Sequence, residues 1–519
     1  MFVRKPTLAA AALSACIAGA LNLAAVPASA QSDTRAFAAA LRSAGSSDSE
    51  MGAFYRARNF QPLWIQGSFI SPQAERLLEL LTTADLDGID PEHYRPRRLF
   101  AVLQDAERGS PRALARAEMA LSRAFVQYAR DLRRPTNTGM TYVDKALAPT
   151  VPTPMALLGR TAELFASGRS VDEAIGLNPL YTELREGYGK WRERWGNLPR
   201  FQIPAGPALT LGADGERVRL LRQRLGLTPS GSYDKDVAAA VREFQAAHGL
   251  PTTGVAHTLT IEALNQGREQ QEAKLRLNLA RARALPANQD RYVLVDAAAQ
   301  RLWMYENGRP LDSMKVIVGR ASEPTPMLAA LIRFAVVNPY WNVPPDLVKE
   351  RIAPAVLKQG VKHLAAERYQ VLTDWTDDAK VVDPKKVDWA AVAGGRIELP
   401  LRQLPGRANS MGAMKFMFPN DFGVYLHDTP QKKLFGQADR RQSAGCVRVE
   451  DAARLARWLF GSVPTPKTSE PEQAVPLPRP VPVYITYMTA APTETGIAFR
   501  DDFYGRDKAA VTRFASGAD

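Results

Sequence analysis

The spacing of apolar residues changes near Arg291, and this change limits the chain to a helical part followed by a β-rich part. Before it, apolar residues recur at helical spacing, as in residues 113–132. After it, short segments such as residues 301–305 end at turn residues such as Asn307 and Gly308, which is typical of strands joined by hairpins. A chain of 519 residues is long enough for about three domains. We therefore expect a multidomain α+β protein.

Residues 1–30 have the three-part pattern of a secretory signal peptide. Arg4 and Lys5 precede an apolar stretch rich in alanine and leucine, and small residues precede Gln31. We expect residues 1–30 to be removed on export. A lipid anchor on Cys16 is the alternative, although the residues after this cysteine stay apolar where a lipoprotein would have a polar tether. No later stretch is apolar over the roughly 18 residues of a membrane span, so we expect no transmembrane segment in the mature chain.

Loss of residues 1–30 would leave one cysteine, Cys446. A single thiol cannot form an internal disulfide or a multi-cysteine metal centre, so Cys446 is either a buried apolar residue or a reactive group. His248 and His257 have no acidic cluster beside them, and we expect no metal site. The net charge falls from +13 to +11 without residues 1–30, which contain two basic and no acidic residues. This excess suits nucleic acid, anionic lipid or an acidic cell-wall polymer.

Composition and periodicity divide the mature chain into several parts. Residues 31–200 are mainly helical, and residues 209–265 form a compact unit with three short helices. The short strands that begin at Arg291 indicate a β-sandwich. Residues 346–388 interrupt the strands with helical patterns, as an insertion that is either a lid or a structural excursion. Seven prolines in residues 464–482 predict an irregular surface loop.

Cys446 has the neighbours that thiol chemistry needs. His427 lies 19 residues earlier and could serve as the base if the intervening loop folds back. Gly445 lets the backbone approach closely, and the N–H groups of Gly445 and Cys446 could stabilise a developing oxyanion. Arg441 and Arg448 flank the thiol, and their charges would favour the thiolate and attract a substrate carboxylate.

Together these residues resemble the catalytic signature of the L,D-transpeptidases, in which a histidine at a strand end precedes a Ser-x-Gly-Cys-x-Arg block. The match comprises, in order, His427, Ser443, Gly445, Cys446 and Arg448. One departure is Ala444, since many family members have histidine immediately before the glycine. The large periplasmic branch often has a small residue there, and residues 54–64, 86–91, 338–344 and 415–420 are similar to that branch as well.

Residues 205–268 resemble the peptidoglycan-binding module of three helices that many cell-wall enzymes carry. The resemblance lies in residues 218–225, 240–245, 248–250 and 253–255. The alternative is a small helical domain that only packs against its neighbours. The full set of resemblances implies the following organisation: signal peptide 1–30, helical scaffold domain 31–200, peptidoglycan-binding module 205–268, and a β-sandwich-like catalytic domain 290–510 with a capping insertion at 346–408.

The family resemblance implies a periplasmic enzyme that uses neither cofactor nor metal. Cys446 would attack the carbonyl of the third residue of a peptidoglycan stem tetrapeptide, usually diaminopimelate, and would release D-alanine. An amine of another stem would then take the acyl group from the thioester. His427 would move the protons, and a backbone carbonyl, for which Asp428 is the candidate, would orient its ring. Tyr425 either lines the donor groove or packs, and carbapenems are expected to acylate Cys446.

Three alternatives remain open. The acceptor could be water or a lipoprotein lysine instead of a stem amine. The protein could be a non-catalytic wall-binding protein in which Cys446 is inert. Nucleic-acid binding is the least favoured use of the basic charge, because no recognised binding motif occurs and the chain is exported.

Overall fold

The computed structural model describes residues 28–45, 49–67, 69–199, 201–287, 289–376, 378–494, 496–508 and 510. The predicted signal peptide up to residue 27, and with it Cys16, lies outside these residues. The chain divides into two compact units, one formed by Met1–Ser71 with Arg97–Ser122 and the other by Pro72–Pro96 with Arg123–Asp519. Among the described residues, no helix combines the length and the apolar character that crossing a membrane requires.

A buried carboxylate organises the first unit. This unit contains α1 (Ala28–Ala44), α2 (Ser49–Ala57), the hairpin of β1 (Ile65–Gln66) and β2 (Phe69–Ile70), most of α4 (Pro96–Ala106) and the first half of α5 (Pro111–Asp131). The Glu118 carboxylate accepts hydrogen bonds from the backbone N–H groups of Leu63 at 2.5 Å and Trp64 at 3.0 Å. It also accepts one from the Tyr55 hydroxyl at 2.6 Å. The aromatic motif at residues 54–64 therefore has a structural role.

A second buried carboxylate, Asp87, holds the helical part of the second unit. This part consists of α3 (Pro72–Thr82), η1 (Ala84–Asp87), η2 (Pro91–Tyr94), the end of α5, η3 (Lys145–Leu147), α6 (Pro154–Ala166), α7 (Val171–Ile175), α8 (Pro179–Trp191) and η4 (Arg192–Gly196). Asp87 accepts hydrogen bonds from the Tyr128 hydroxyl at 2.7 Å and from Arg185 Nε at 2.8 Å. The turn motif at residues 86–91 thus presents a carboxylate that ties together helices distant in sequence.

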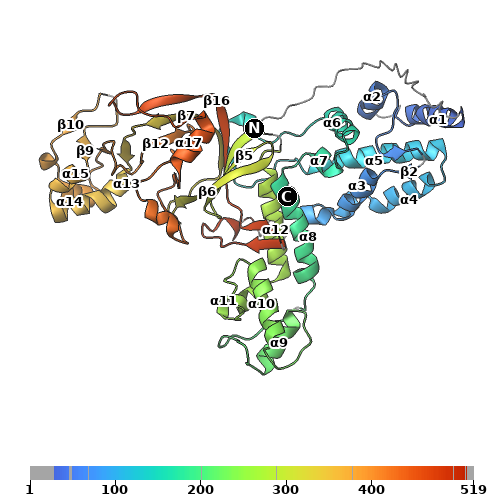
Figure 1. The fold of residues 1–519 in the computed structure, drawn as a ribbon, viewed down its shortest axis with the longest axis horizontal. Coiled ribbons are helices and arrows are strands. Elements are labelled where there is room, and N and C mark those ends of the chain that lie inside the picture. The colour runs from blue at the N-terminus through green and yellow to red at the C-terminus, as the bar shows by residue number, and fades with distance from the viewer. Residues whose placement is uncertain are drawn as a thin grey trace, which may run out of the picture. The chain divides into compact units, whose positions relative to one another are not determined.

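The three predicted helices of the compact unit are present. They are α9 (Glu216–Arg224), α10 (Lys235–Ala247) and α11 (Thr258–Asn265), which Figure 1 shows grouped together, and α12 (Arg268–Arg283) follows. His248 ends α10, and the centre of its ring lies 3.8 Å from that of Phe244 and 5.4 Å from that of Phe499. Burial lowers the pKa of His248 to about 4. This histidine is packed between aromatic side chains.

The β-rich part of the second unit is built on a ten-stranded mixed sheet. Its strands are β3 (Thr141–Tyr142), β4 (Arg291–Asp296), β5 (Arg301–Glu306), β6 (Arg309–Gly319), β7 (Leu328–Val337), β12 (Met414–Met417), β13 (Leu426–His427), β14 (Arg441–Ser443), β15 (Val447–Val449) and β16 (Gln473–Thr486). The order is β12-β13-β15-β6-β5-β4-β16-β7-β3, with β14 beside β6. Because β12 also pairs with β7, the sheet closes on itself and its halves face each other, as expected of a sandwich-like domain.

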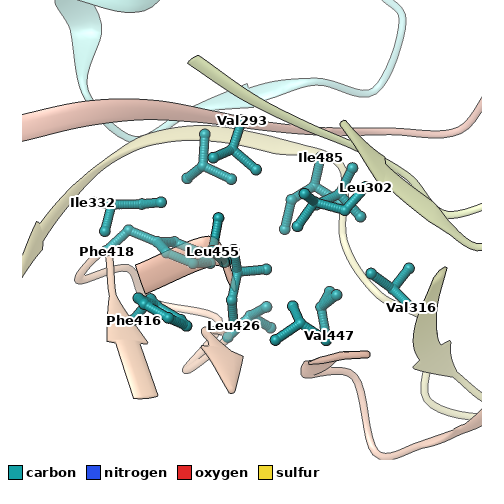
Figure 2. Close-up of a cluster of buried hydrophobic side chains, with 14 of the residues drawn as sticks. Val293, Leu302, Val316, Ile332, Phe416, Phe418, Leu426, Val447, Leu455 and Ile485 are labelled. Carbon is teal, nitrogen blue, oxygen red and sulfur yellow. The ribbon is translucent and has the colours of Figure 1, made fainter. Parts of the chain in front are cut away.

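Alternation of apolar and polar residues places one face of these strands in the core. Figure 2 shows Phe416, Leu426 and Val447 of three neighbouring strands pointing into it. Leu455 of α17 (Ala452–Phe460) belongs to the same cluster. Residues that alternate with these, such as Arg448, lie on the opposite face of the strands. The multidomain α+β fold predicted from the sequence is confirmed.

The insertion is a subdomain with its own sheet and core. The sheet has the order β10 (Val381–Val382), β9 (Tyr369–Leu372), β11 (Leu401–Gln403) and β8 (Trp341–Val343). Its helices are α13 (Pro345–Leu347), η5 (Val348–Ile352), α14 (Ala353–Gln359), α15 (Lys362–Ala366), η6 (Pro384–Lys386) and α16 (Trp389–Ala393). Figure 1 shows α13, α14 and α15 gathered with β9 and β10, apart from α9, α10 and α11. Buried Val343, Val371 and Leu401 join the strands in one core.

The prediction of an irregular loop at residues 464–482 is wrong for its second half. β16 begins at Gln473 and pairs with β7 as far as Ile485. The register of the pairing shifts between Pro476 and Val481, and such an irregularity accommodates prolines that cannot donate to a ladder. The sequence also gave no signal for the hairpin that follows, formed by β17 (Ala490–Thr493) and β18 (Gly496–Phe499).

Candidate active site

The parallel pairing of β13 with β15 brings the predicted histidine and cysteine to one face of the sheet. Leu426 pairs with Val447, and His427 pairs with Arg448. Leu426 and Val447 point into the core, so the residues that alternate with them point the other way. His427 and Cys446 therefore share the outer face, although 18 residues separate them in sequence. The same argument adds Tyr425 and Arg448 to this face.

His427 is fully buried, and its orientation is set by the backbone. Its Nδ1 lies 2.6 Å from the carbonyl oxygen of Asp428. A carbonyl only accepts hydrogen bonds, so Nδ1 carries the proton and Nε2 has the free lone pair of a base. Burial, followed by the positive charge of Arg448, lowers the pKa of His427 to about 3. The imidazole is therefore neutral at pH 7.

The Asp428 side chain binds other groups than its backbone carbonyl does. Its carboxylate accepts hydrogen bonds from Lys432 Nζ at 2.7 Å and from the N–H of Ala413 at 2.9 Å. A Cβ at Gly412, where φ is +61°, would come within 2.3 Å of this carboxylate. The carboxylate thus fixes the turn before β12, and only the carbonyl faces the histidine ring.

Cys446 is half-buried beside Tyr425. Burial raises the pKa of the Cys446 thiol, while hydrogen bonds from Tyr425 and the charges of Arg448 and Lys415 act in the opposite direction. The net shift is upward because burial outweighs these effects, although the charge of Arg448 does favour the thiolate. The second of those arginines, Arg441, is turned to Asp439, with its Nε 2.7 Å from the carboxylate.

The turn that carries the thiol is held by its own residues. The Ser443 hydroxyl donates to the carbonyl oxygen of Cys446 at 2.5 Å. Gly445 has φ of +102°, a conformation that other residues rarely adopt. In the part of the chain that the structure describes, the N–H groups of Gly445 and Cys446 donate to no acceptor. They are therefore available to an acceptor from outside the turn.

Arg448 offers a half-buried guanidinium without an acidic partner among the described residues. Its Nη1 donates to the neutral amide oxygen of Gln431 at 2.9 Å, and its Nε is buried with no acceptor. Burial lowers the pKa of Arg448, and the positive charge of Arg351 in η5 acts in the same direction. A half-buried cation that no carboxylate of the described residues neutralises is suited to an anionic ligand.

Lys415 is a site residue that sequence reasoning missed. It pairs directly with His427 across β12 and β13, on the side opposite Arg448. Its Nζ lies 3.0 Å from the Glu472 carboxylate and 5.9 Å from the centre of the Tyr425 ring. The polar position within the apolar pattern Met414–Met417 could have indicated a residue on the outer face. The described residues contain no cluster of acidic, histidine or cysteine side chains that could hold a metal ion.

A cysteine on the same face as a histidine with a free ring nitrogen is the combination of groups used in nucleophilic acyl transfer. Three family models match separate parts of this chain. Residues 290–483 match the L,D-transpeptidase catalytic domain, residues 49–187 the Scaffold domain, and residues 214–264 a peptidoglycan-binding domain. Residues 290–483 thus match the model of the L,D-transpeptidase catalytic domain, and the resemblance predicted from the sequence is confirmed.

Individual proteins are similar as well. A Haemophilus influenzae protein named as an L,D-transpeptidase is 31% identical over 242 residues, which are 45% of this chain and 48% of that protein. The chain therefore spans about half the length of this curated relative. The solved L,D-transpeptidase of Xylanimonas cellulosilytica is 17% identical with a TM-score of 0.16, over 54% of this chain and 98% of that one. A mutant of the Enterococcus faecium L,D-transpeptidase is 13% identical with a TM-score of 0.19, over 39% of this chain and 52% of that one.

Proposed function

We propose that this protein is a peptidoglycan L,D-transpeptidase that uses Cys446 as its nucleophile. The observation that carries the proposal is the register of β13 and β15, which gives His427 and Cys446 a common face within a domain of the L,D-transpeptidase family. The donor is a stem tetrapeptide with diaminopimelate at its third position. The product is a cross-link between the third residues of two stems.

The first half of the reaction forms the thioester. Cys446 Sγ attacks the carbonyl carbon of the third residue while His427 Nε2 takes the thiol proton. The N–H groups of Gly445 and Cys446 bind the oxyanion. The intermediate then expels the amine of D-alanine, which takes the proton from the imidazolium. Because the free thiol and imidazole are both neutral, proton transfer accompanies the attack and does not precede it.

The second half transfers the acyl group to an amine. The side-chain amine of another stem attacks the thioester carbonyl and gives a proton to His427. The C–S bond breaks, Cys446 leaves as the thiol after taking that proton back, and an amide bond links the stems. A thioester retains enough reactivity for this step without an external energy source.

Arg448 is the proposed contact for a substrate carboxylate. Stem peptides carry free carboxylates, and the guanidinium next to Cys446 has no acidic partner among the described residues. Tyr425 limits the donor groove beside the thiol, and Ser443 supports the turn without contacting substrate. Carbapenems would acylate the same sulfur.

The remaining parts of the chain suit the same function. Residues 205–268 would bind the glycan of peptidoglycan, and the segment at 214–264 matches a domain family of that kind. Residues 1–30 would direct export to the periplasm. A peptidoglycan partner accounts for the basic charge without nucleic acid.

Defined muropeptides test the proposal and its alternatives. The purified protein is incubated with a tetrapeptide muropeptide, and the products are identified by mass. We expect a cross-linked dimer with free D-alanine, and no product with Cys446→Ala. Lys433→Ala, at an exposed residue of the same loop, is the control and should keep full activity. A tripeptide product alone would indicate water as the acceptor, and transfer only to a lipoprotein lysine would indicate an anchoring enzyme. An unchanged substrate, or activity in Cys446→Ala, would contradict the proposal.

A further inference from the structure

We propose that Thr325 is a positioning residue that aims the oxyanion-binding N–H of Cys446, and that Tyr504 and Arg506 of the C-terminal segment hold it in place. The role of Thr325 in catalysis rests on the proposed function. Its geometry rests on four hydrogen bonds around one buried hydroxyl and its backbone.

The Thr325 hydroxyl joins the end of β6 to the turn that carries Cys446. It accepts a hydrogen bond from the N–H of Gly319 at 2.9 Å, where β6 ends. It donates its single hydrogen to the carbonyl oxygen of Gly445 at 2.8 Å. The side chain is fully buried, so no solvent competes for this hydrogen. The orientation of the Gly445 carbonyl is therefore fixed from outside the cysteine turn.

The planarity of the peptide bond carries this constraint to the reaction. The carbonyl of Gly445 and the N–H of Cys446 belong to one trans peptide unit, in which the two bonds point in opposite directions. A carbonyl held on Thr325 consequently directs the Cys446 N–H away from Thr325. Ser443 holds the next carbonyl, that of Cys446, so the peptide units on both sides of the nucleophile are fixed. Since Gly445 tolerates many conformations, the turn needs these external bonds.

The C-terminal segment clamps the backbone on both sides of the Thr325 loop. The Tyr504 hydroxyl donates to the carbonyl oxygen of Gly319 at 2.7 Å and accepts from the N–H of Thr325 at 3.3 Å. Arg506 Nη2 donates to the carbonyl oxygen of Thr325 at 2.7 Å. The guanidinium carbon of Arg506 lies 4.7 Å from the centre of the Tyr504 ring, so the two residues also support each other. Residues that follow the nucleophile by more than fifty positions thus determine its setting.

Two reactions of Cys446 distinguish an effect of Thr325 on the oxyanion site from a general effect on packing. Acylation of Cys446 by a p-nitrophenyl ester passes through an oxyanion, whereas alkylation by iodoacetamide does not. Neither reagent depends on peptidoglycan, so this test stands even if the muropeptide assay fails. Mass spectrometry of the Cys446 peptide from the full chain measures both rates and excludes labelling elsewhere.

For Thr325→Val, which keeps the shape and removes the hydroxyl, we expect acylation to slow by about 10- to 100-fold, less than the roughly 10²- to 10³-fold lost with an entire oxyanion donor, because the N–H of Cys446 remains and only its orientation changes. The alkylation rate should stay within about twofold of the wild type, and kcat on muropeptides should fall without a comparable change in KM. Thr325→Ser should restore acylation, and Tyr504→Phe should lower it less than Thr325→Val does. Equal acylation in Thr325→Val and wild type would overturn the proposal. So would equal losses of acylation and alkylation, or a serine variant as slow as the valine variant.

Discussion

The ring of His427 is oriented by the carbonyl oxygen of Asp428, which lies 2.6 Å from Nδ1, while the Asp428 carboxylate binds Lys432. The histidine therefore depends on backbone geometry where many catalytic histidines depend on an acid. Any substitution at residue 428 that preserves the backbone keeps the tautomer of the ring. This relationship separates the roles of the two residues experimentally.

We predict that Asp428→Asn retains most of the activity, with kcat reduced less than about tenfold, because its carbonyl still faces His427. His427→Gln should lose at least about 10² of kcat, the usual contribution of general acid–base catalysis. Steady-state kinetics on a tetrapeptide donor compare the two. The lost ion pair with Lys432 is partly exposed and should cost about 1 kcal/mol or less in stability. Equal losses of kcat in the two variants would show that the carboxylate is needed.

Acid should destabilise the fold through His427. In the unfolded chain a histidine has a pKa near 6.5, whereas burial lowers the pKa of His427 to about 3. Between these values the unfolded state binds a proton that the native state does not. Stability is therefore lost as the pH falls below about 6.5, by up to about 1.4 kcal/mol per pH unit.

Thermal unfolding between pH 7 and pH 4 measures this effect. His427→Gln should flatten the pH dependence, and His248, whose pKa burial lowers to about 4, should account for part of the slope that remains. His363→Gln, in α15, is the control and should keep the wild-type slope. A wild-type slope in His427→Gln would show that this histidine does not stay neutral in the native state.

Because the Arg448 guanidinium has no acidic partner among the described residues, we predict that its loss weakens substrate binding. Arg448→Gln should raise KM for a donor peptide by about tenfold or more, since a charge-assisted hydrogen bond is worth about 1.5–3 kcal/mol. Arg441→Gln should change KM little, because Arg441 is occupied by Asp439. With a donor peptide whose carboxylates are amidated, wild type and Arg448→Gln should have the same KM. If the amidated donor still distinguishes them, Arg448 acts on the thiol instead of the substrate.

Alanine substitutions at two glycines with positive φ distinguish the cost of backbone strain from a loss of activity. Gly445 has φ of +102° and Gly308, in the turn between β5 and β6, has φ of +75°, and an added Cβ meets no atom within 4 Å at either position. Alanine should therefore cost each site about 1–2 kcal/mol of backbone strain alone. Gly445→Ala should also lose most of the acyl transfer, whereas Gly308→Ala should keep it. Denaturant unfolding gives the stability loss, and full activity of Gly445→Ala would remove the turn from the proposed mechanism.

The order of the proposed catalytic residues along the chain was predictable, and their surroundings were not. The His427 and Cys446 motifs indicated the pair, and alternation within β12, β13 and β15 explains why both leave the core. The sequence could not show how deeply Cys446 is buried, so the burial that raises the pKa of its thiol against the charge of Arg448 was not predictable. Arg441 looked equivalent to Arg448 by spacing alone, yet Asp439 binds it.

Features that depend on distant pairing escaped prediction for the same reason. β16 accepts its prolines because its register against β7 shifts, and a count of prolines contains no information on register. Thr325 reaches Gly445 only because β6 and the cysteine turn are neighbours in the folded sheet. Both relationships are set by contacts between segments more than one hundred residues apart.

Trapping the acyl-enzyme tests directly whether Cys446 is the nucleophile. The wild-type protein and Cys446→Ala are mixed with a tetrapeptide donor without acceptor, quenched in acid within the first turnover, and digested for mass spectrometry. We expect the Cys446 peptide to gain the mass of the donor minus D-alanine, hydroxylamine to remove this mass, and Cys446→Ala to carry none. Release of D-alanine at the wild-type rate by Cys446→Ala, or an acyl group on another residue, would contradict it.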